Sequence, residues 1–115
     1  MGLVKLDGAD GHLVSGEYST ARGPVLRSDN LELTRGFYER GKGADTQSHP
    51  EEQIIYVLTG RARVTLGGEE YEVSPGQVSF HPSNVPHALV ALEDLTVLSV
   101  KRLVSPTYEA TGKLV

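Results

Sequence analysis

Apolar and polar residues alternate along most of this chain in short segments, and glycine or proline separates one segment from the next. Alternation with a period of two is typical of strands with one buried face, whereas a helix repeats its apolar residues every three or four positions. The clearest segment is 61–66, where Ala62, Val64 and Leu66 alternate with arginines and are expected on the buried side. The pattern predicts β-structure nearly throughout and no amphipathic helix.

The other predicted strands follow the same rule. Gly67 and Gly68 can adopt the positive backbone angles of a tight hairpin, and Pro75-Gly76 and Glu93-Asp94 mark two more turns. A series of this kind closes into a barrel or jelly roll, which hides its sheet edges. We expect the tail, 105–115, to be irregular or to pack on a neighbour. The remaining predicted strands are 31–38, 69–73, 77–81, 87–92 and 95–104.

Composition restricts the class of protein. A chain of 115 residues is long enough for one domain with a single core. Its net charge is -4 and its basic residues are scattered, so we expect no nucleic-acid partner, and no predicted helix could read DNA. The absence of cysteine excludes disulfides, a thiolate nucleophile and sulfur-ligated zinc. No apolar run has signal-peptide or transmembrane length, so we expect a soluble, cytoplasmic protein without a membrane partner.

Nearly all residues able to do chemistry lie in two stretches, 41–60 and 76–87. Alternate residues of an extended chain share a face, so one strand running over 47–59 would direct Gln47, His49 and Gln53 to the same side. His87 follows a proline-rich turn and is the natural fourth donor. Four donor side chains would then converge on one cavity.

The spacing in these stretches resembles that of the cupin family. Its first motif places glycine, two histidines, a glutamate and a second glycine at fixed intervals, and here these positions, 41–60, hold Gly41, Gln47, His49, Gln53 and Gly60. The resemblance implies one all-β domain over 1–115, folded as the double-stranded β-helix or jelly-roll barrel of cupins.

The second cupin motif corresponds to 76–91. Gly76, Pro82 and His87 fit its pattern, whereas Asn84 stands in place of a glycine and Ala91 in place of an asparagine. The family's usual ligands are three histidines and one glutamate. At their positions this chain has Gln47, His49, Gln53 and His87.

The resemblance therefore implies a site for one divalent transition metal. Nitrogen and oxygen donors without sulfur are compatible with zinc, nickel, manganese, cobalt or iron, and two amides should hold the ion less tightly than imidazoles would. The donor set carries no negative charge, so a bound ion would keep its full charge and attract an anionic ligand.

Each candidate also has a structural alternative. Gln53 could satisfy its amide with a backbone hydrogen bond, and Gln47 could line the pocket and contact the ligand instead. Glu51 and His81 are the candidate catalytic groups: Glu51 as replacement ligand or general base, and His81 as acid or base with a pKa near neutrality. The alternatives that we favour are a solvated side chain for Glu51 and a position on the rim for His81. His12 is expected on the surface.

For function, the chain resembles the small cupins that linearise unsaturated uronates in pectin and alginate breakdown, a likeness that includes the run Pro-Glu-Glu-Gln-Ile-Ile-Tyr-Val-Leu over 50–58. This implies a metal-dependent enzyme acting on a small oxygenated carboxylate, such as a sugar acid, by isomerisation, ring opening or lyase chemistry. Two alternatives stay open: an iron-dependent dioxygenase-type cupin, and a non-catalytic barrel that binds a sugar or another small ligand.

Most small cupins are dimers, so the resemblance also implies a homodimer. The N-terminal region, 1–30, could supply strands that pair across the interface or strands that complete its own barrel. The apolar residues that would do so are Leu3, Val4, Leu6, Leu13 and Val14.

Overall fold

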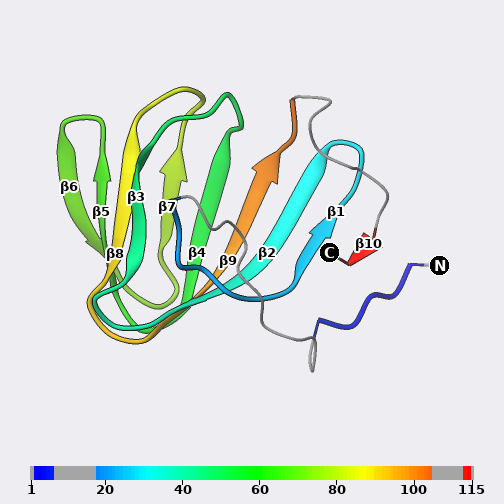
Figure 1. Ribbon diagram of the computed structural model, residues 1–115, viewed down its shortest axis with the longest axis horizontal. Helices are drawn as coiled ribbons and strands as arrows, with labels where there is room; N and C mark the ends of the chain where they lie inside the picture. Colours follow the sequence, from blue (N-terminus) through cyan, green and yellow to red (C-terminus); the bar gives the residue numbers. More distant parts are fainter. Residues whose placement is uncertain (1, 7–17, 105–112, 115) are drawn as a thin grey trace.

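The computed structural model describes residues 2–6, 18–104 and 113–114, which form two antiparallel sheets packed as a cupin jelly roll. The six-stranded sheet has the order β10-β1-β2-β9-β4-β7, and the four-stranded sheet has the order β3-β8-β5-β6. Figure 1 shows β6 and β5 at one end of the molecule and β1 and β10 at the other. The described residues contain no helix, and hence none with the length and apolar character needed to cross a membrane.

The strand bounds are as follows. The six-stranded sheet contains β1 (Val25–Arg27), β2 (Leu31–Tyr38), β4 (Gln53–Thr59), β7 (Val78–His81), β9 (Leu95–Arg102) and β10 (Lys113–Leu114). The four-stranded sheet contains β3 (Gly43–Gln47), β5 (Ala62–Leu66), β6 (Glu69–Val73) and β8 (His87–Ala91).

The predicted strands are confirmed to within one or two residues at their ends. Ala62 and Val64 are fully buried and Arg63 is exposed, as the alternation requires. In the hairpin between β5 and β6, Gly67 has a φ of 59°, whereas Gly68 does not adopt a positive φ. The short-range pattern therefore sets both the strands and the side that each one buries in this hairpin.

One predicted strand is wrong. The single strand expected over 47–59 is two strands in different sheets, because β3 ends at Gln47 and β4 begins at Gln53. Pro50 lies in the connection, where it has no N–H to donate to a sheet ladder. The chain crosses from one sheet to the other here, so Gln47 and Gln53 approach the space between the sheets from opposite sides.

The two ends of the chain also differ from expectation. Residues 2–6 form no strand, and Lys113 and Leu114 pair with β1, so this part of the tail is regular. His12, Leu13, Val14 and the tail residues 105–112 and 115 lie outside the described residues.

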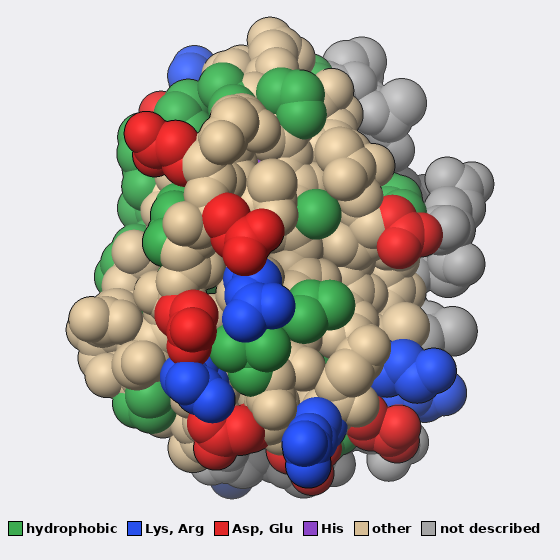
Figure 2. Space-filling model, turned by 90° about the vertical axis from the view of Figure 1, so that its left-hand side faces the viewer, with side chains coloured by type: hydrophobic (Ala, Val, Ile, Leu, Met, Phe, Trp, Pro, Cys, Tyr) green, Lys and Arg blue, Asp and Glu red, His purple; other side chains and the backbone are tan. Residues whose placement is uncertain are grey.

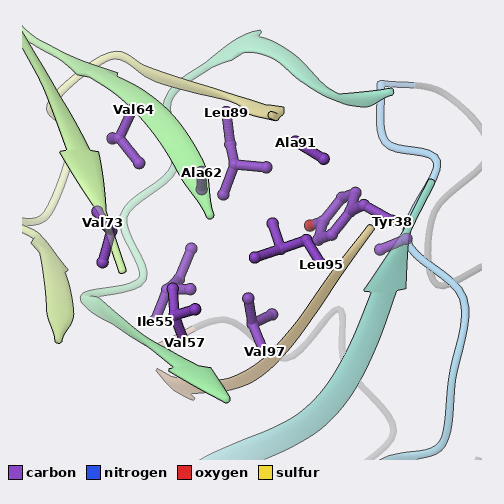
Figure 3. Packing of buried hydrophobic residues seen from close by; sticks show 11 residues of the cluster. Tyr38, Ile55, Val57, Ala62, Val64, Val73, Leu89, Ala91, Leu95 and Val97 are labelled. Atoms are coloured by element: carbon purple, nitrogen blue, oxygen red, sulfur yellow. The ribbon is translucent and has the colours of Figure 1, made fainter. Parts of the chain in front are cut away.

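The hydrophobic core lies between the sheets (Figure 3). Its side chains point inward from both sheets, and Leu95, Ala62 and Val64 have no exposed surface. The buried cluster consists of Ala21, Tyr38, Ile55, Val57, Ala62, Val64, Val73, Leu89, Ala91, Leu95 and Val97.

Towards the other end, the inner face of the six-stranded sheet is polar. Successive cross-strand partners on β1, β2, β9, β4 and β7 form a row across the sheet, here called the polar row: Arg27, Glu32, Lys101, Gln53 and His81. The charge of the buried Glu32 is balanced by Arg27, whose Nε lies 2.6 Å from Glu32 Oε2. The interior of this sheet thus changes from apolar to polar along its strands, and the polar end is where the candidate site lies.

Candidate functional site

A cavity of about 60 Å³ lies between the two sheets at the polar row. Gln53, His81 and Lys101 reach it from the six-stranded sheet, and Gln47 and His87 reach it from the four-stranded sheet. Four of these five residues are among the predicted site residues, but Lys101 is not. In the sequence Lys101 is only a charged residue near the end of a predicted strand. That its side chain points into the cavity becomes clear only from the register of β9 with β4.

The two motifs are joined by hydrogen bonds between their turns. Asn84 donates its backbone N–H to the carbonyl oxygen of His49 at 2.8 Å, and Ser83 Oγ donates to the carbonyl oxygen of Pro50 at 2.7 Å. Asn84 has a φ of 63°, the left-handed conformation that glycine or asparagine accepts most readily. Asparagine can therefore replace the family's glycine here and still position the turn before His87.

His49 and His87 have the same hydrogen-bonding arrangement. His49 Nδ1 donates to the carbonyl oxygen of Glu51 at 2.8 Å, and His87 Nδ1 donates to that of Val85 at 2.9 Å. A carbonyl oxygen only accepts, so in both neutral rings Nδ1 carries the proton and Nε2 keeps a free lone pair. Both Nε2 atoms are buried and have no hydrogen-bond partner, and the ring centroids lie 4.8 Å apart.

His81 is fully buried, so the favoured position on the rim is wrong. Residues 79 and 81 of β7 face inward, whereas Val78 and Phe80 face outward. The His81 ring centroid lies 4.4 Å from that of His87, and Nε2 shares a 2.7 Å hydrogen bond with Ser79 Oγ. Its Nδ1 is buried without a partner, which makes it the third such imidazole nitrogen in this region.

The two glutamines face these histidines across the strands. Gln47 is the cross-strand partner of His87, and Gln53 is that of His81. Gln53 is buried, and its Nε2 donates to Ser99 Oγ at 2.7 Å, so a side-chain hydroxyl takes the place of the backbone partner considered above. With its nitrogen engaged, Oε1 is the atom that Gln53 has left to offer a cation.

Glu51 is also buried, contrary to the expectation of a solvated side chain. Its backbone carbonyl holds His49, and its carboxylate Oε1 lies 3.9 Å from His49 Nδ1. Both contacts are to Nδ1 rather than to Nε2, and neither Glu51 nor His49 is among the residues lining the cavity. The arrangement orients His49 rather than placing a carboxylate beside the free lone pairs.

The electrostatics favour neutral imidazoles. Burial, with smaller contributions from His87 and His49, lowers the pKa of His81 to about 4. Burial is also the main cause that lowers the pKa of His49, and the positive charge of Lys101 acts in the same direction. Burial lowers the pKa of His87 as well, with His49 and Lys101 adding to it and the bond to Val85 opposing it. At neutral pH the site therefore presents uncharged nitrogen donors beside Lys101, and Glu32, the cross-strand partner of that lysine, is paired with Arg27.

The donor set can be compared with what a metal ion needs. Within the described part of the chain, no three His, Cys, Asp or Glu side chains are grouped so that they could hold a metal ion by themselves. An ion here would need the glutamine amides as well as the imidazoles. The free Nε2 atoms fit this use, because a histidine ligand commonly donates its other N–H to a backbone carbonyl.

Residues 37–101, which run from the end of β2 to the end of β9, match the family model of the cupin domain and make up more than half of the chain. The chain belongs to the cupin family. The two motifs and the jelly-roll fold of this cupin agree with that assignment.

Several bacterial proteins are similar to this cupin. The chain is 32% identical over 76 residues to the uncharacterized protein SCO3923 of Streptomyces coelicolor, a match that covers 65% of this cupin and 72% of the relative. The structure of KdgF from Halomonas sp. is similar with a TM-score of 0.74 and 27% identity, over 85% of this chain and 89% of that one. An RmlC-like cupin from Shewanella frigidimarina shares the fold, with a TM-score of 0.75, 16% identity and coverage of 92% and 94%.

Proposed function

We propose that this cupin is a metal-dependent enzyme that acts on a small oxygenated carboxylate, such as a sugar acid. The observation that carries the proposal is the pair of buried Nε2 atoms of His49 and His87, each with a free lone pair and no protein partner. Leaving two such acceptors unsatisfied is costly, and a cation would satisfy both. His49 and His87 would hold the ion together with the amide oxygens of Gln47 and Gln53.

A divalent ion in this place would supply Lewis-acid chemistry, polarising a carbonyl or hydroxyl oxygen of the ligand. The chain's own contribution begins with Lys101. This lysine lines the cavity next to Gln53 in the register, and no acidic side chain forms an ion pair with it among the described residues. Its ammonium group is suited to bind a carboxylate, which supports an anionic ligand on grounds independent of the metal.

His81 is the candidate proton acceptor. Its pKa of about 4 lies well below the near-neutral value expected from the sequence, so the ring is neutral at physiological pH and Nδ1 offers a lone pair of low basicity. Ser79 holds the ring at Nε2 and is itself bonded to Tyr71 Oη at 2.7 Å, which fixes the direction of Nδ1. We assign Glu51 the different task of orienting His49.

The choice of a sugar acid rests on the resemblance to uronate-linearising cupins, and the similarity to KdgF supports it. That reading implies an isomerisation, ring-opening or lyase reaction, without oxygen as a substrate. Enzymes of the dioxygenase type hold iron with three histidines or with two histidines and a carboxylate. His49, His81 and His87 lie together here, but no three His, Asp or Glu side chains of the described residues are grouped so that they could hold an ion by themselves, so this alternative has less support. The carboxylate of Glu51 lies 3.9 Å from His49 Nδ1 and therefore not beside the free lone pair of Nε2.

The experiment is an assay of protein loaded separately with zinc, nickel, manganese, cobalt and iron, against unsaturated uronates. Loss of the ultraviolet absorbance of the conjugated double bond measures linearisation, and an oxygen electrode runs in parallel. We expect turnover that requires added metal, consumes no oxygen and disappears in His87→Ala. Oxygen uptake would support the dioxygenase instead. Saturable binding without turnover of any carboxylate would support the binding barrel and contradict the proposed catalysis.

A further inference from the structure

The cavity between the sheets has a charged side away from the histidines. Glu32 lines it from β2, and Lys101 lines it from β9. Among the described residues that line the cavity, Glu32 is the one acidic side chain, and Lys101 is the one lysine or arginine. Lys101 has a task in the proposed function, whereas this buried carboxylate has none.

The register places the two charged residues side by side in the polar row. Glu32 is the cross-strand partner of Lys101, which is in turn the partner of Gln53. Side chains opposite one another on neighbouring strands have Cβ atoms about 4.5–5.5 Å apart. Two strands, β9 and β4, separate Glu32 from His81. The row thus has neutral donors for a cation towards one end and a pair of opposite charges towards the other.

These opposite charges lie next to each other without forming an ion pair. Glu32 is only 4% exposed and is bonded to Arg27 instead, with 2.6 Å between Arg27 Nε and Glu32 Oε2. Arg27 lies on β1 and does not line the cavity, so it binds Glu32 from the side away from Lys101. A carboxylate can accept about four hydrogen bonds, so this bond leaves acceptor sites for the cavity side.

The inward row next to the polar row carries hydroxyl groups on the same two strands. Thr34 and Ser99 are cross-strand partners, and both are buried and line the cavity. A hydroxyl group both donates and accepts hydrogen bonds. The wall beside Glu32 and Lys101 is therefore polar but uncharged, which suits the hydroxyl groups of a sugar better than an apolar chain.

We infer that Glu32 and Lys101 select the ligand as a pair: Lys101 binds its carboxylate, and Glu32 accepts hydrogen bonds from its hydroxyl groups. The inference rests on the proposed function, because it takes a hydroxylated carboxylate as the ligand. Hydrogen bonds from hydroxyl donors to a carboxylate are roughly twice as strong as neutral ones, whereas a carboxylate repels another anion nearby. Glu32 therefore favours a sugar acid over a carboxylate that has no hydroxyl group to offer.

A carboxylate that only pairs with Arg27 and touches no ligand would behave in the opposite way. Removal of its negative charge would then strengthen the binding of every anion in the cavity, because only repulsion is lost. Glu32→Gln separates the two cases, since it removes the charge and keeps a polar side chain of the same length. A ligand that donates hydroxyl groups to Glu32 should bind this variant more weakly, and an anion without hydroxyl groups should not.

The experiment measures the binding of galacturonate and of cyclohexanecarboxylate to the metal-reconstituted full chain by calorimetric titration. Cyclohexanecarboxylate has a ring of the same size and a carboxylate but no hydroxyl group. We expect Glu32→Gln to bind galacturonate roughly tenfold more weakly than the wild type does, because charge-assisted hydrogen bonds are lost. Its affinity for cyclohexanecarboxylate should stay the same or rise.

Two further variants complete the design. Glu32→Asp keeps the charge beside Arg27 but shortens the side chain, so it should weaken galacturonate and leave cyclohexanecarboxylate unchanged, and it serves if Glu32→Gln does not fold. Glu72→Gln is the matched control, because it removes an equal charge from the exposed strand β6, where Arg61 pairs with Glu72 at 2.8 Å. Figure 2 shows acidic and basic side chains interspersed over the surface at this end of the molecule. The control should bind both anions as the wild type does.

The outcomes distinguish a failure of this inference from a failure of the proposed function. Tighter binding of both anions to Glu32→Gln, or unchanged galacturonate affinity in both Glu32 variants, would overturn the inference and leave the metal-dependent enzyme in place. Weaker galacturonate binding in these variants, in a wild type that never turns a sugar acid over, would support the inference and contradict the enzyme. A wild type that binds neither anion would overturn both.

Discussion

Asn84 donates its backbone N–H to the carbonyl oxygen of His49 at 2.8 Å, so the turn before His87 is fastened to the turn that carries His49. The same residue has a φ of 63°. One backbone position therefore both connects the two motifs and requires a left-handed conformation, which explains why only a residue tolerant of that conformation can replace the family's glycine there.

Substitution of Asn84 should show whether this position needs the left-handed backbone conformation or the amide side chain. Asn84→Val should lower the free energy of unfolding by about 1–2 kcal/mol, because a β-branched residue is strained at this φ. Asn84→Gly keeps the backbone N–H and the conformation, so it should have a much smaller effect. Urea unfolding of the two variants measures the difference, and equal losses in both would contradict the explanation.

Acid should destabilise the metal-free protein through its buried histidines. In the unfolded chain His81 takes up its proton as the pH falls past about 6.5, but in the folded protein only near pH 4. Between these values the unfolded state binds more protons, so the free energy of unfolding falls as the pH falls, by about 3 kcal/mol at most from this residue.

His81→Asn should reduce this acid sensitivity, and the remaining part should come from His49 and His87, whose pKa values are also lowered. The measurement is thermal or urea unfolding from pH 7 to pH 4 in the presence of a chelator. The same slope in the wild type and in His81→Asn would show that His81 is not the neutral buried group described above.

Gln47→His should tighten metal binding. Imidazole is a stronger donor than an amide oxygen for most divalent transition metals, so we expect roughly tenfold higher affinity if residue 47 is a ligand. Gln77→His, in the turn before β7, is the control because it adds an imidazole outside the cavity. Calorimetric titration with zinc or nickel distinguishes them. If both variants gain equally, or if neither gains, Gln47 lines the pocket without binding metal.

Lys101→Gln should weaken the binding of anionic ligands. The substitution removes the cavity's cation and keeps a polar side chain of similar length, so affinity for galacturonate should fall roughly tenfold, as expected for loss of a charge-assisted hydrogen bond. Lys42→Gln, on the exposed surface, is the matched control. Added salt should weaken the wild type more than Lys101→Gln. An unchanged affinity in Lys101→Gln would remove the argument for an anionic ligand.

Local pattern was sufficient for most of the fold. The alternation in β5 and the turn at Gly67 can be read from neighbouring residues, and the structure confirms both. Neighbouring residues alone could not show that the strand predicted over 47–59 is two strands in different sheets. A periodicity of two persists through Pro50 even though the chain changes sheets there, and only long-range pairing decides that change.

For the site, the motif spacing identified His49, His87 and the two glutamines as residues that come together, and the structure places them around one region. The misjudged residues, His81 and Glu51, are buried polar groups. Their burial depends on the surrounding structure: the cross-strand partner Gln53 and the same-strand neighbour Ser79 for His81, and the turn beside His49 for Glu51. Lys101 was missed for the same reason, since its place in the cavity depends on its register with Gln53.

The central claim is that His49 and His87 hold a divalent metal ion, and elemental analysis of untagged protein tests it most directly. Wild type, His49→Ala and His87→Ala are purified without added metal or chelator and then reconstituted, with His12→Ala, outside both motifs, as control. The account predicts about one equivalent of transition metal in the wild type and in the control, and its loss from folded His49→Ala and His87→Ala. A wild type that takes up no metal, or metal content that survives both substitutions, would contradict it.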